Sequence, residues 1–299
     1  MALFKKKTTL VHHITYMGIM AAINLIFIVL ATFVPPLMFF LILLLPFASA
    51  VVSYYCLKRF YIIYAVATIG LCLLCSFNIS DTIFYVVPAV ISGFVIGVLL
   101  EKKIHPFWMV LSSTVINAAL TYAFIPLINL ITNTDSVYAL LKMFALENYT
   151  YKTEFIYLFI FFISLMQCLL SHFIIISDAK KIGIEINTRI DYFGPYILGL
   201  ELSITIGIIL AFFFFPLALV FICISFYFGV FLLLDLMFSK KLLFYLLTAF
   251  SFLVMIFVFA ILYKLLTEPY GLVLIVLFPL VIGVLSFLKN CLLKYPSNI

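Results

Sequence analysis

The stretch VVPAVISGFVIGVLLEKK, residues 86–103, shows the pattern that decides the fold of this chain. Its apolar run continues without charge as far as Leu100, and Glu101, Lys102 and Lys103 follow at once. A helix of about 20 apolar residues crosses the hydrocarbon core of a bilayer, and Lys and Arg gather at the cytoplasmic ends of such helices. The stretch therefore predicts a transmembrane helix over residues 83–100 that ends in the cytoplasm.

Similar apolar stretches recur along the whole chain. Hydrophobic residues make up 68% of it and charged residues only 9%, whereas soluble domains are about 45–50% apolar and about 25% charged. We therefore expect an all-α, polytopic integral membrane protein embedded in the lipid bilayer. Its ten predicted transmembrane helices cover residues 14–34, 37–57, 60–77, 83–100, 107–132, 154–176, 193–214, 216–238, 242–265 and 271–288.

The basic residues orient these helices. With the N-terminus in the cytoplasm and the helices alternating in direction, 14 of the 17 Lys and Arg lie on the cytoplasmic side. They are Lys5, Lys6, Lys7, Lys58, Arg59, Lys102, Lys103, Lys180, Lys181, Arg189, Lys240, Lys241, Lys289 and Lys294. This bias predicts a multi-pass protein of the cell membrane with both termini in the cytoplasm. The net charge of +6 is spread over helix ends, so it indicates contact with lipid headgroups and predicts no nucleic-acid partner.

The most polar stretch of the chain, Asp178–Asp191, separates two groups of predicted helices. We expect a six-helix membrane domain over residues 1–176, a cytoplasmic polar connector over 177–191 and a four-helix membrane domain over 192–299. Outside the membrane, segment 133–153 places apolar residues at helical spacing and predicts an amphipathic helix on the outer interface. That helix is either a lid over a pocket or a simple interfacial connector.

Proline and small residues predict local features of the membrane helices. The Pro35-Pro36 and Phe215-Pro216 pairs predict turns, because proline cannot continue a helical hydrogen-bond ladder without a break. Pro46, Pro88 and Pro126 are expected to break helices within the bilayer and to free carbonyl groups. The small residues of Gly18-x-x-x-Ala22 and Gly93-x-x-x-Gly97 predict close contacts between helices.

Few polar side chains lie at membrane depth. Glu201 is the clearest, about 13 Å from the cytoplasmic end of its helix at 1.5 Å per residue. It is either a proton or cation site or a polar anchor between helices, whereas Asp235 is interpreted as a solvated or salt-bridged residue at a helix end. The uncharged polar residues could line a cavity or form hydrogen bonds between helices; they are Asn24, Asn117, Asn129, Gln167 and His172.

The sequence contains no phosphate-binding loop, no G-x-S-x-G, no H-E-x-x-H and no paired intramembrane Asp. We therefore expect no catalytic residues, no metal site and no cofactor, and an intramembrane enzyme ranks last among the hypotheses. No ATP-binding domain is recognisable either. Energised transport would then depend on an ion gradient or on another subunit.

The order of several motifs resembles the YybS-like family of uncharacterised bacterial membrane proteins. These motifs are MGIMAAIN (Met17–Asn24), LLLPF (Leu43–Phe47), the stretch quoted first, KKIGIEI (Lys180–Ile186) and DYFGPY (Asp191–Tyr196). That family is grouped with the substrate-binding S-components of energy-coupling-factor (ECF) vitamin transporters. The resemblance covers most of the chain, although ordinary S-components lack the last four helices.

The resemblance implies a six-helix bundle that holds a vitamin or a related nutrient near its outer side. It also implies that the first helix contacts a coupling membrane subunit, which works with two ATPases, through small residues that correspond here to Gly18, Ala21 and Ala22. Our leading hypothesis is thus an S-component-like protein that binds a small molecule. Candidate pocket residues are Asn78, Asp81 and Thr82 at the outer loop, with Asn117 and Tyr122 on the fifth helix.

Two alternatives remain open. The protein could be a membrane scaffold or regulator without transport activity, acting through Asp178–Asp191. It could also be a proton-linked carrier that uses Glu201.

Overall fold

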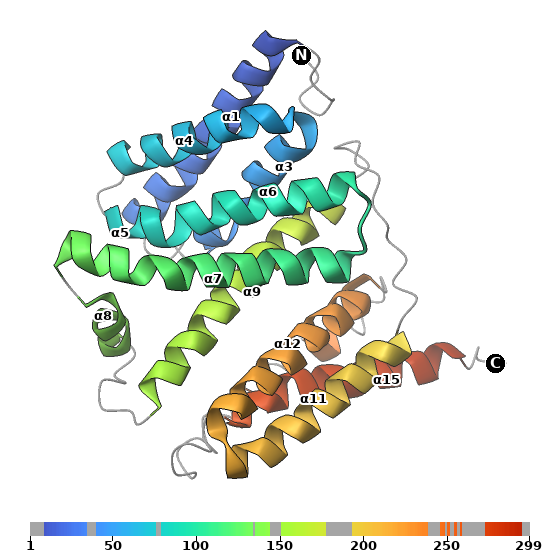
Figure 1. Cartoon of the computed structure of the whole chain (residues 1–299). Helices are drawn as coiled ribbons and strands as arrows, with labels where there is room; N and C mark the ends of the chain where they lie inside the picture. The colour runs from blue at the N-terminus through green and yellow to red at the C-terminus, as the bar shows by residue number, and fades with distance from the viewer. Residues whose placement is uncertain are drawn as a thin grey trace. The chain divides into compact units, whose positions relative to one another are not determined.

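The computed structural model describes residues 9–34, 40–75, 79–133, 135–143, 151–177, 193–238, 246–248, 250–251, 254–255, 258 and 273–294. All regular structure in these residues is helical (Figure 1). Within the described part of the chain, eight helices are long and apolar enough to cross a membrane, and Phe40–Tyr55 forms a shorter apolar helix. The prediction of an all-α, multi-pass membrane protein is confirmed at this level. The ninth predicted helix, 242–265, lies mostly outside the described residues, so ten crossings stay a prediction.

The chain divides into two compact units. Unit 1 comprises Met1–Glu147 and Phe159–Thr188, and unit 2 comprises Asn148–Leu158 and Arg189–Ile299. The predicted connector 177–191 spans the change from one unit to the other, and all of it after Ser177 lies outside the described residues.

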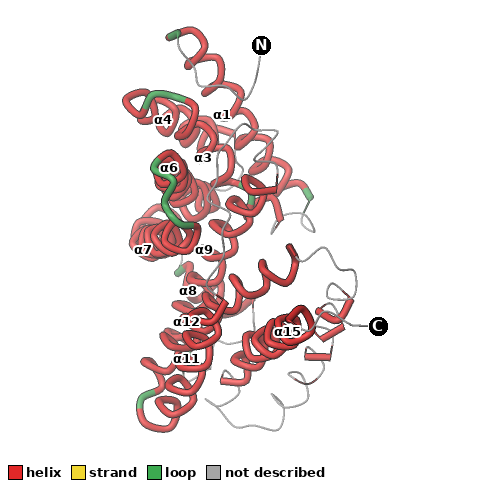
Figure 2. Tube along the Cα trace, turned by 90° about the vertical axis from the view of Figure 1, so that its right-hand side faces the viewer, coloured by secondary structure: helices red, strands yellow, loops and turns green. Residues whose placement is uncertain are grey.

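In its described residues, unit 1 contains six main helices and three short segments. The main helices are α1 (Leu10–Phe33), α3 (Leu45–Tyr55), α4 (Lys58–Cys75), α6 (Val87–Glu101), α7 (Pro106–Thr132) and the part of α9 (Lys152–Ser177) that begins at Phe159. The short segments are α5 (Ile79–Asp81), the π-helical turn η1 (Thr82–Val86) and α8 (Ser136–Met143). Helix α6 packs on α3 and α7, and α1 packs on α3 and α4 (Figures 1 and 2).

Two glycines set the contact between α3 and α6. A Cβ added to Gly93 would lie 2.5 Å from Ser49 Cβ, and one added to Gly97 would lie 2.5 Å from the Ala50 carbonyl oxygen. Real Cβ atoms do not approach their neighbours so closely, so the two backbones reach this separation only because both residues lack a side chain. The close contact predicted from the Gly93-x-x-x-Gly97 spacing is confirmed, and its partner is α3.

The three prolines differ in their effects. Pro46 and Pro88 lie in the first turns of α3 and α6, where helices tolerate a residue without an N–H. Pro126 lies inside α7, which continues to Thr132. The predicted break at Pro126 is therefore wrong. A proline removes a single backbone hydrogen bond, and in α7 the helix continues on both sides of it.

The ends of the helices agree with the predicted alternation. Lys58 Nζ lies 2.9 Å from Glu101 Oε2, which places the start of α4 beside the end of α6. The rings of His13 and Phe60 lie 5.4 Å apart, so α1 starts at the same end of the unit. The structure thus brings together helix ends that the sequence assigns to the cytoplasmic side.

The helix predicted between the fifth and sixth spans is confirmed for residues 136–143, and its place on the outer interface stays a prediction. Asp135 Oδ1 accepts hydrogen bonds from the backbone N–H of Val137 and Tyr138, and this caps the first turn of α8. Leu141 is buried, whereas Tyr138 and Lys142 are exposed. The remainder of the segment up to residue 150 lies outside the described residues.

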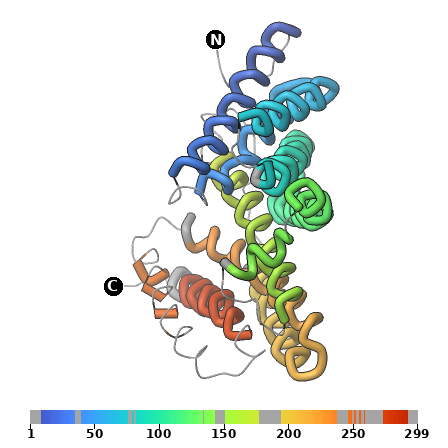
Figure 3. The backbone as a smooth tube through the Cα atoms, turned by 90° about the vertical axis from the view of Figure 1, so that its left-hand side faces the viewer, coloured from blue at the N-terminus to red at the C-terminus, as the bar shows by residue number. Residues whose placement is uncertain are grey.

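Unit 2 is built on a hairpin of two long helices. Helix α11 (Phe193–Phe213) and helix α12 (Phe215–Phe238) are separated by Phe214 alone, which confirms the turn predicted at Phe215-Pro216 (Figure 3). The 3-10 turn η2 (Leu274–Val276) leads into α15 (Leu277–Lys294), which packs on α12 and α11.

An ion pair joins the C-terminal parts of α12 and α15. Lys289 Nζ donates to Asp235 Oδ2 at 2.8 Å and to the Asp235 carbonyl oxygen at 2.7 Å. The two helices therefore run in the same direction, as expected if one crossing, predicted over 242–265, lies between them. The interpretation of Asp235 as a salt-bridged residue is confirmed, with Lys289 as its partner.

Candidate functional site

A network of polar side chains lies at the centre of unit 1 and is organised by Asn117 of α7. Asn117 is 1% exposed, and its Nδ2 donates to Ser92 Oγ at 3.0 Å and to Gln167 Oε1 at 2.9 Å. Its Oδ1 accepts from Ser164 Oγ at 3.1 Å and from Thr121 Oγ1 at 3.3 Å. The residues of each helix are three or four positions apart, so they share one helix face. We call these five residues, together with Ser171 and His172 of α9, the polar centre.

Gln167 ties the polar centre to the break before α3. Its Nε2 donates to the Ile42 carbonyl oxygen at 3.2 Å. In a regular helix that carbonyl would accept the N–H of residue 46, but residue 46 is proline and has no N–H. Gln167 thus replaces a hydrogen bond that Pro46 removes. The prediction that proline frees a carbonyl inside the bilayer is confirmed here, and a side chain of α9 occupies it.

A second buried network joins α1, α3 and α4. Asn24 Nδ2 donates to Tyr64 Oη at 3.1 Å and to Ser49 Oγ at 3.4 Å. Ser49 Oγ and Tyr64 Oη are 3.1 Å apart. These contacts are hydrogen bonds between helices, which was one of the two interpretations of Asn24.

Three atoms of the polar centre lack hydrogen-bond partners among the described residues. Ser171 Oγ and both ring nitrogens of His172 are buried and have no hydrogen-bond partner among the described residues. They lie one helical turn beyond Gln167 and Cys168 on α9, about 5.4 Å toward its C-terminal end. The imidazole has one donor and one acceptor when neutral, and the hydroxyl can do both. The arrangement can therefore bind a polar group through hydrogen bonds.

The candidate pocket predicted at the outer loop is only partly described. Asn78 lies outside the described residues, and so does the side chain of Asp81. Thr82 is buried in η1, where its hydroxyl donates to the Cys72 carbonyl oxygen at 3.4 Å. Tyr122 is 47% exposed on α7, whereas Asn117 is buried. Five residues advance a helix by about 140° beyond a full turn, so the structure does not bring Tyr122 to the face that carries Asn117.

Sequence reasoning named Asn117, Gln167 and His172 but missed three serines of the polar centre. Ser92 precedes Gly93, and Ser164 and Ser171 lie three and four residues from Gln167. That helical spacing from a buried amide was the signal that could have identified Ser164 and Ser171.

The small residues of α1 divide between two faces. Gly18 and Ala22 are exposed, and no atom lies within 4 Å of a Cβ added at Gly18. Ala21 is buried against the core of unit 1. The three residues expected on one coupling face are therefore not together, because Ala21 and Ala22 are neighbours and point about 100° apart.

Comparisons with known proteins add no identity. No family model, no curated protein and no solved structure matches this chain. The resemblance to the YybS-like family thus stays a prediction, and the function has to be argued from the side chains themselves.

In unit 2, Glu201 is the acidic residue that the sequence singled out. It is exposed on α11 and lines a groove of about 500 Å³ between α11 and α15. Its carboxylate has no ion-pair or hydrogen-bond partner among the described residues, although its backbone carbonyl accepts a bond from Thr205. In the part of the chain that the structure describes, no group of three or more His, Cys, Asp or Glu is placed to hold a metal ion.

Proposed function

We propose that this protein is a multi-pass protein of the cell membrane whose unit 1 binds a small, uncharged polar molecule, as the first step of its uptake. One observation carries the proposal. Ser171 Oγ and both ring nitrogens of His172 are buried without hydrogen-bond partners among the described residues, and Ser171 lies one helical turn from Gln167, which bonds to Asn117.

The physical argument is one of unpaired groups in a low-dielectric interior. A buried donor or acceptor without a partner costs about 1–3 kcal/mol, and the bilayer offers no water to relieve that cost. A ligand whose polar groups pair with Ser171 and His172 recovers part of it on binding. The polar centre contains no Asp, Glu, Lys or Arg, so it favours an uncharged ligand over an ion.

The proposed partners rest on the resemblance to the YybS-like family and on the exposed small residues of α1. The proposal assigns energy supply to a separate ECF-type coupling subunit with its ATPases. The exposed face of α1 that includes Gly18 and Ala22 is suited to close contact with such a subunit, because small residues let helix backbones approach. The proposal retains the predicted orientation, with the N- and C-termini in the cytoplasm.

Native mass spectrometry of the gently purified, full-length protein tests the proposal. We expect a retained small molecule in the wild-type protein and its loss in Asn117→Ala and Ser171→Ala. Ser112→Ala on α7 is the matched control, since the Ser112 hydroxyl bonds to the Trp108 carbonyl of its own helix and to no other group among the described residues. Absence of any small molecule from the wild-type protein, or its equal retention in all variants, would count against a ligand at the polar centre.

A proton-linked carrier is the second candidate, and the unpaired carboxylate of Glu201 favours it. An ionisable side chain at membrane depth is costly and commonly lines an ion pathway. The two candidates place function in different units, so they can be separated by variants. Asn117→Ala impairs the first activity and leaves the second intact, whereas Glu201→Gln does the reverse.

A further inference from the structure

The groove that contains Glu201 continues along most of helix α11. Its first section, of about 500 Å³, is lined by α11 residues from Ile197 to Thr205 and by α15 residues from Leu280 to Leu288. Its second section, of about 420 Å³, is lined by Ile208, Ala211 and Phe212 of α11 and by residues 273–280. Leu280 borders both sections. Ile197 and Phe212 are 15 residues apart, so the groove is about 22 Å long at 1.5 Å per residue.

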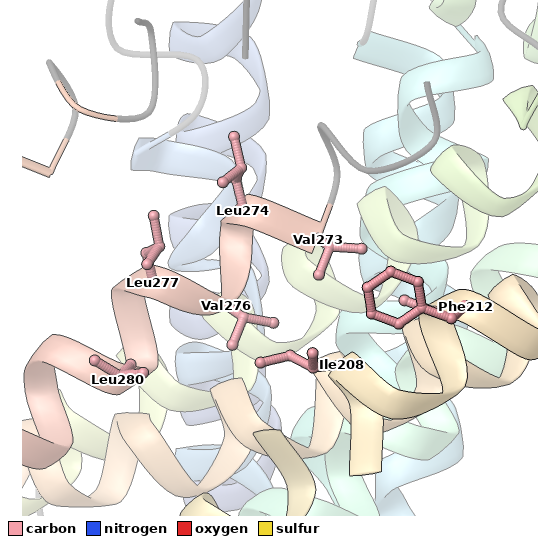
Figure 4. Close-up of a pocket in the computed structure, with 8 residues that line it drawn as sticks. Ile208, Phe212, Val273, Leu274, Val276, Leu277 and Leu280 are labelled. Carbon is pink, nitrogen blue, oxygen red and sulfur yellow. The ribbon is translucent and has the colours of Figure 1, made fainter. Parts of the chain in front are cut away.

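The second section is apolar throughout. Figure 4 shows Ile208 and Phe212 facing Val273 and Val276 across it. In the first section, Gly283 allows Leu200 to approach α15, since a Cβ added to Gly283 would lie 2.6 Å from Leu200 Cδ2. The single charged group that lines either section is the carboxylate of Glu201.

The described part of the preceding predicted helix, 242–265, lies on another face of α15. Thr248, Ser251 and Met255 line a small space with Phe278 and Ile282. On a helix, positions 278 and 282 are turned about 160° from positions 280 and 284, which border the groove. Thr248, Ser251 and Met255 therefore do not line the groove.

The cation nearest to this groove in the sequence is already paired. Lys289 follows Leu288, which lines the groove, but its ammonium group is buried against Asp235. Glu201 lies eight residues into α11, about 12 Å from its start. An anionic carboxylate at that depth requires a counter-charge or protonation.

We propose that this groove binds a lipophilic cation, whose positive group pairs with Glu201 and whose apolar body lies along Ile204, Ile208 and Phe212. The volume of each section falls within the range of about 300–1,000 Å³ that is usual for small-molecule sites. A transmembrane helix of a partner fits less well, because small residues favour close helix contacts, whereas most residues of the groove walls are large, among them Leu280, Phe287 and Phe212. An uncharged lipid would leave the carboxylate without a counter-charge.

The test uses tetraphenylphosphonium and tetraphenylborate, which have nearly the same size and shape but opposite charge. Binding of each to the full-length protein in lipid nanodiscs is measured by equilibrium dialysis. We expect saturable binding of the cation and no binding of the anion. Glu201→Gln should lower the affinity for the cation roughly tenfold or more, which corresponds to a loss of about 1.4 kcal/mol in binding free energy. Glu201→Asp should retain most of the affinity. Glu154→Gln, which removes a carboxylate from the first turn of α9, is the matched control.

Several outcomes would overturn the proposal. Equal binding of the two ions would indicate partition into the bilayer, and unchanged affinity in Glu201→Gln would remove the carboxylate from the site. A disulfide between two copies of Val284→Cys would show that a second chain fills the groove. Asn117→Ala should leave binding of the cation unchanged, so failure here and failure of the function proposed for unit 1 are distinguishable.

Discussion

The bond between Gln167 and the Ile42 carbonyl joins residues 125 positions apart and leads to a prediction about Gln167 and Pro46. Gln167→Leu removes the hydrogen bond to the Ile42 carbonyl that, among the described residues, replaces the N–H missing at Pro46. It leaves the Ile42 carbonyl unpaired, at about 1–3 kcal/mol, and also removes the bond to Asn117, where interhelical bonds average about 0.6 kcal/mol. We expect the free energy of unfolding to fall by about 1.5–3 kcal/mol.

Restoring the backbone N–H should rescue part of this loss. In a Pro46→Ala background, the amide of residue 46 can bond to the Ile42 carbonyl, so Gln167→Leu should cost at least about 1 kcal/mol less than in the wild-type protein. Equilibrium unfolding in mixed micelles, followed by far-ultraviolet circular dichroism, measures all four proteins of the cycle. Pro126→Ala is the matched control, because Pro126 lies inside α7 and does not affect Ile42. Additivity of Pro46→Ala and Gln167→Leu within about 0.5 kcal/mol would refute the reasoning.

Three further predictions concern other contacts. Gly97→Ala should destabilise unit 1 by about 1–3 kcal/mol, since the added Cβ would collide with α3. Gly18→Ala should change stability by less than about 0.5 kcal/mol, and thermal unfolding of the two variants measures the difference. Lys289→Met should lower the free energy of unfolding by about 2–3 kcal/mol, because it leaves Asp235 unpaired. The double variant with Asp235→Leu should lose less than Lys289→Met alone, as measured by unfolding in the same micelles. Glu201→Gln should abolish pH-dependent uptake into proteoliposomes, and an unchanged pH profile excludes the carrier that uses this residue.

The membrane fold was predictable because two independent signals agree. Apolar length locates the helices and basic residues orient them. The Lys58–Glu101 ion pair then brings together helix ends that the charges had assigned to one side. The effect of a single proline on a helix was harder to predict from the sequence. Pro46 and Pro126 are the same residue type, yet one lies at the start of a helix and the other is accommodated within it.

The candidate site was harder to predict, because its composition depends on which helix faces meet. Asn117 and Gln167 are 50 residues apart, and nothing in their local sequence shows that they bond to each other. Tyr122 was grouped with Asn117 by its place in the sequence, but helical rotation turns it to the exposed face. The role of Gln167 at Ile42 depends on a third element, the start of α3. Such contacts require the tertiary structure.

The two units treat polar groups in opposite ways, and this bears on what each can bind. Unit 1 buries amides, hydroxyls and imidazoles in its interior, and its Asn117–Gln167 pair is already hydrogen-bonded, so a ligand there must form hydrogen bonds of matching geometry. Unit 2 pairs its buried cation with Asp235 and leaves Glu201 exposed in an apolar groove. A ligand there gains chiefly from charge and apolar area, which require little directional precision. We therefore expect selectivity for one uncharged molecule in unit 1 and tolerance of many lipophilic cations in unit 2.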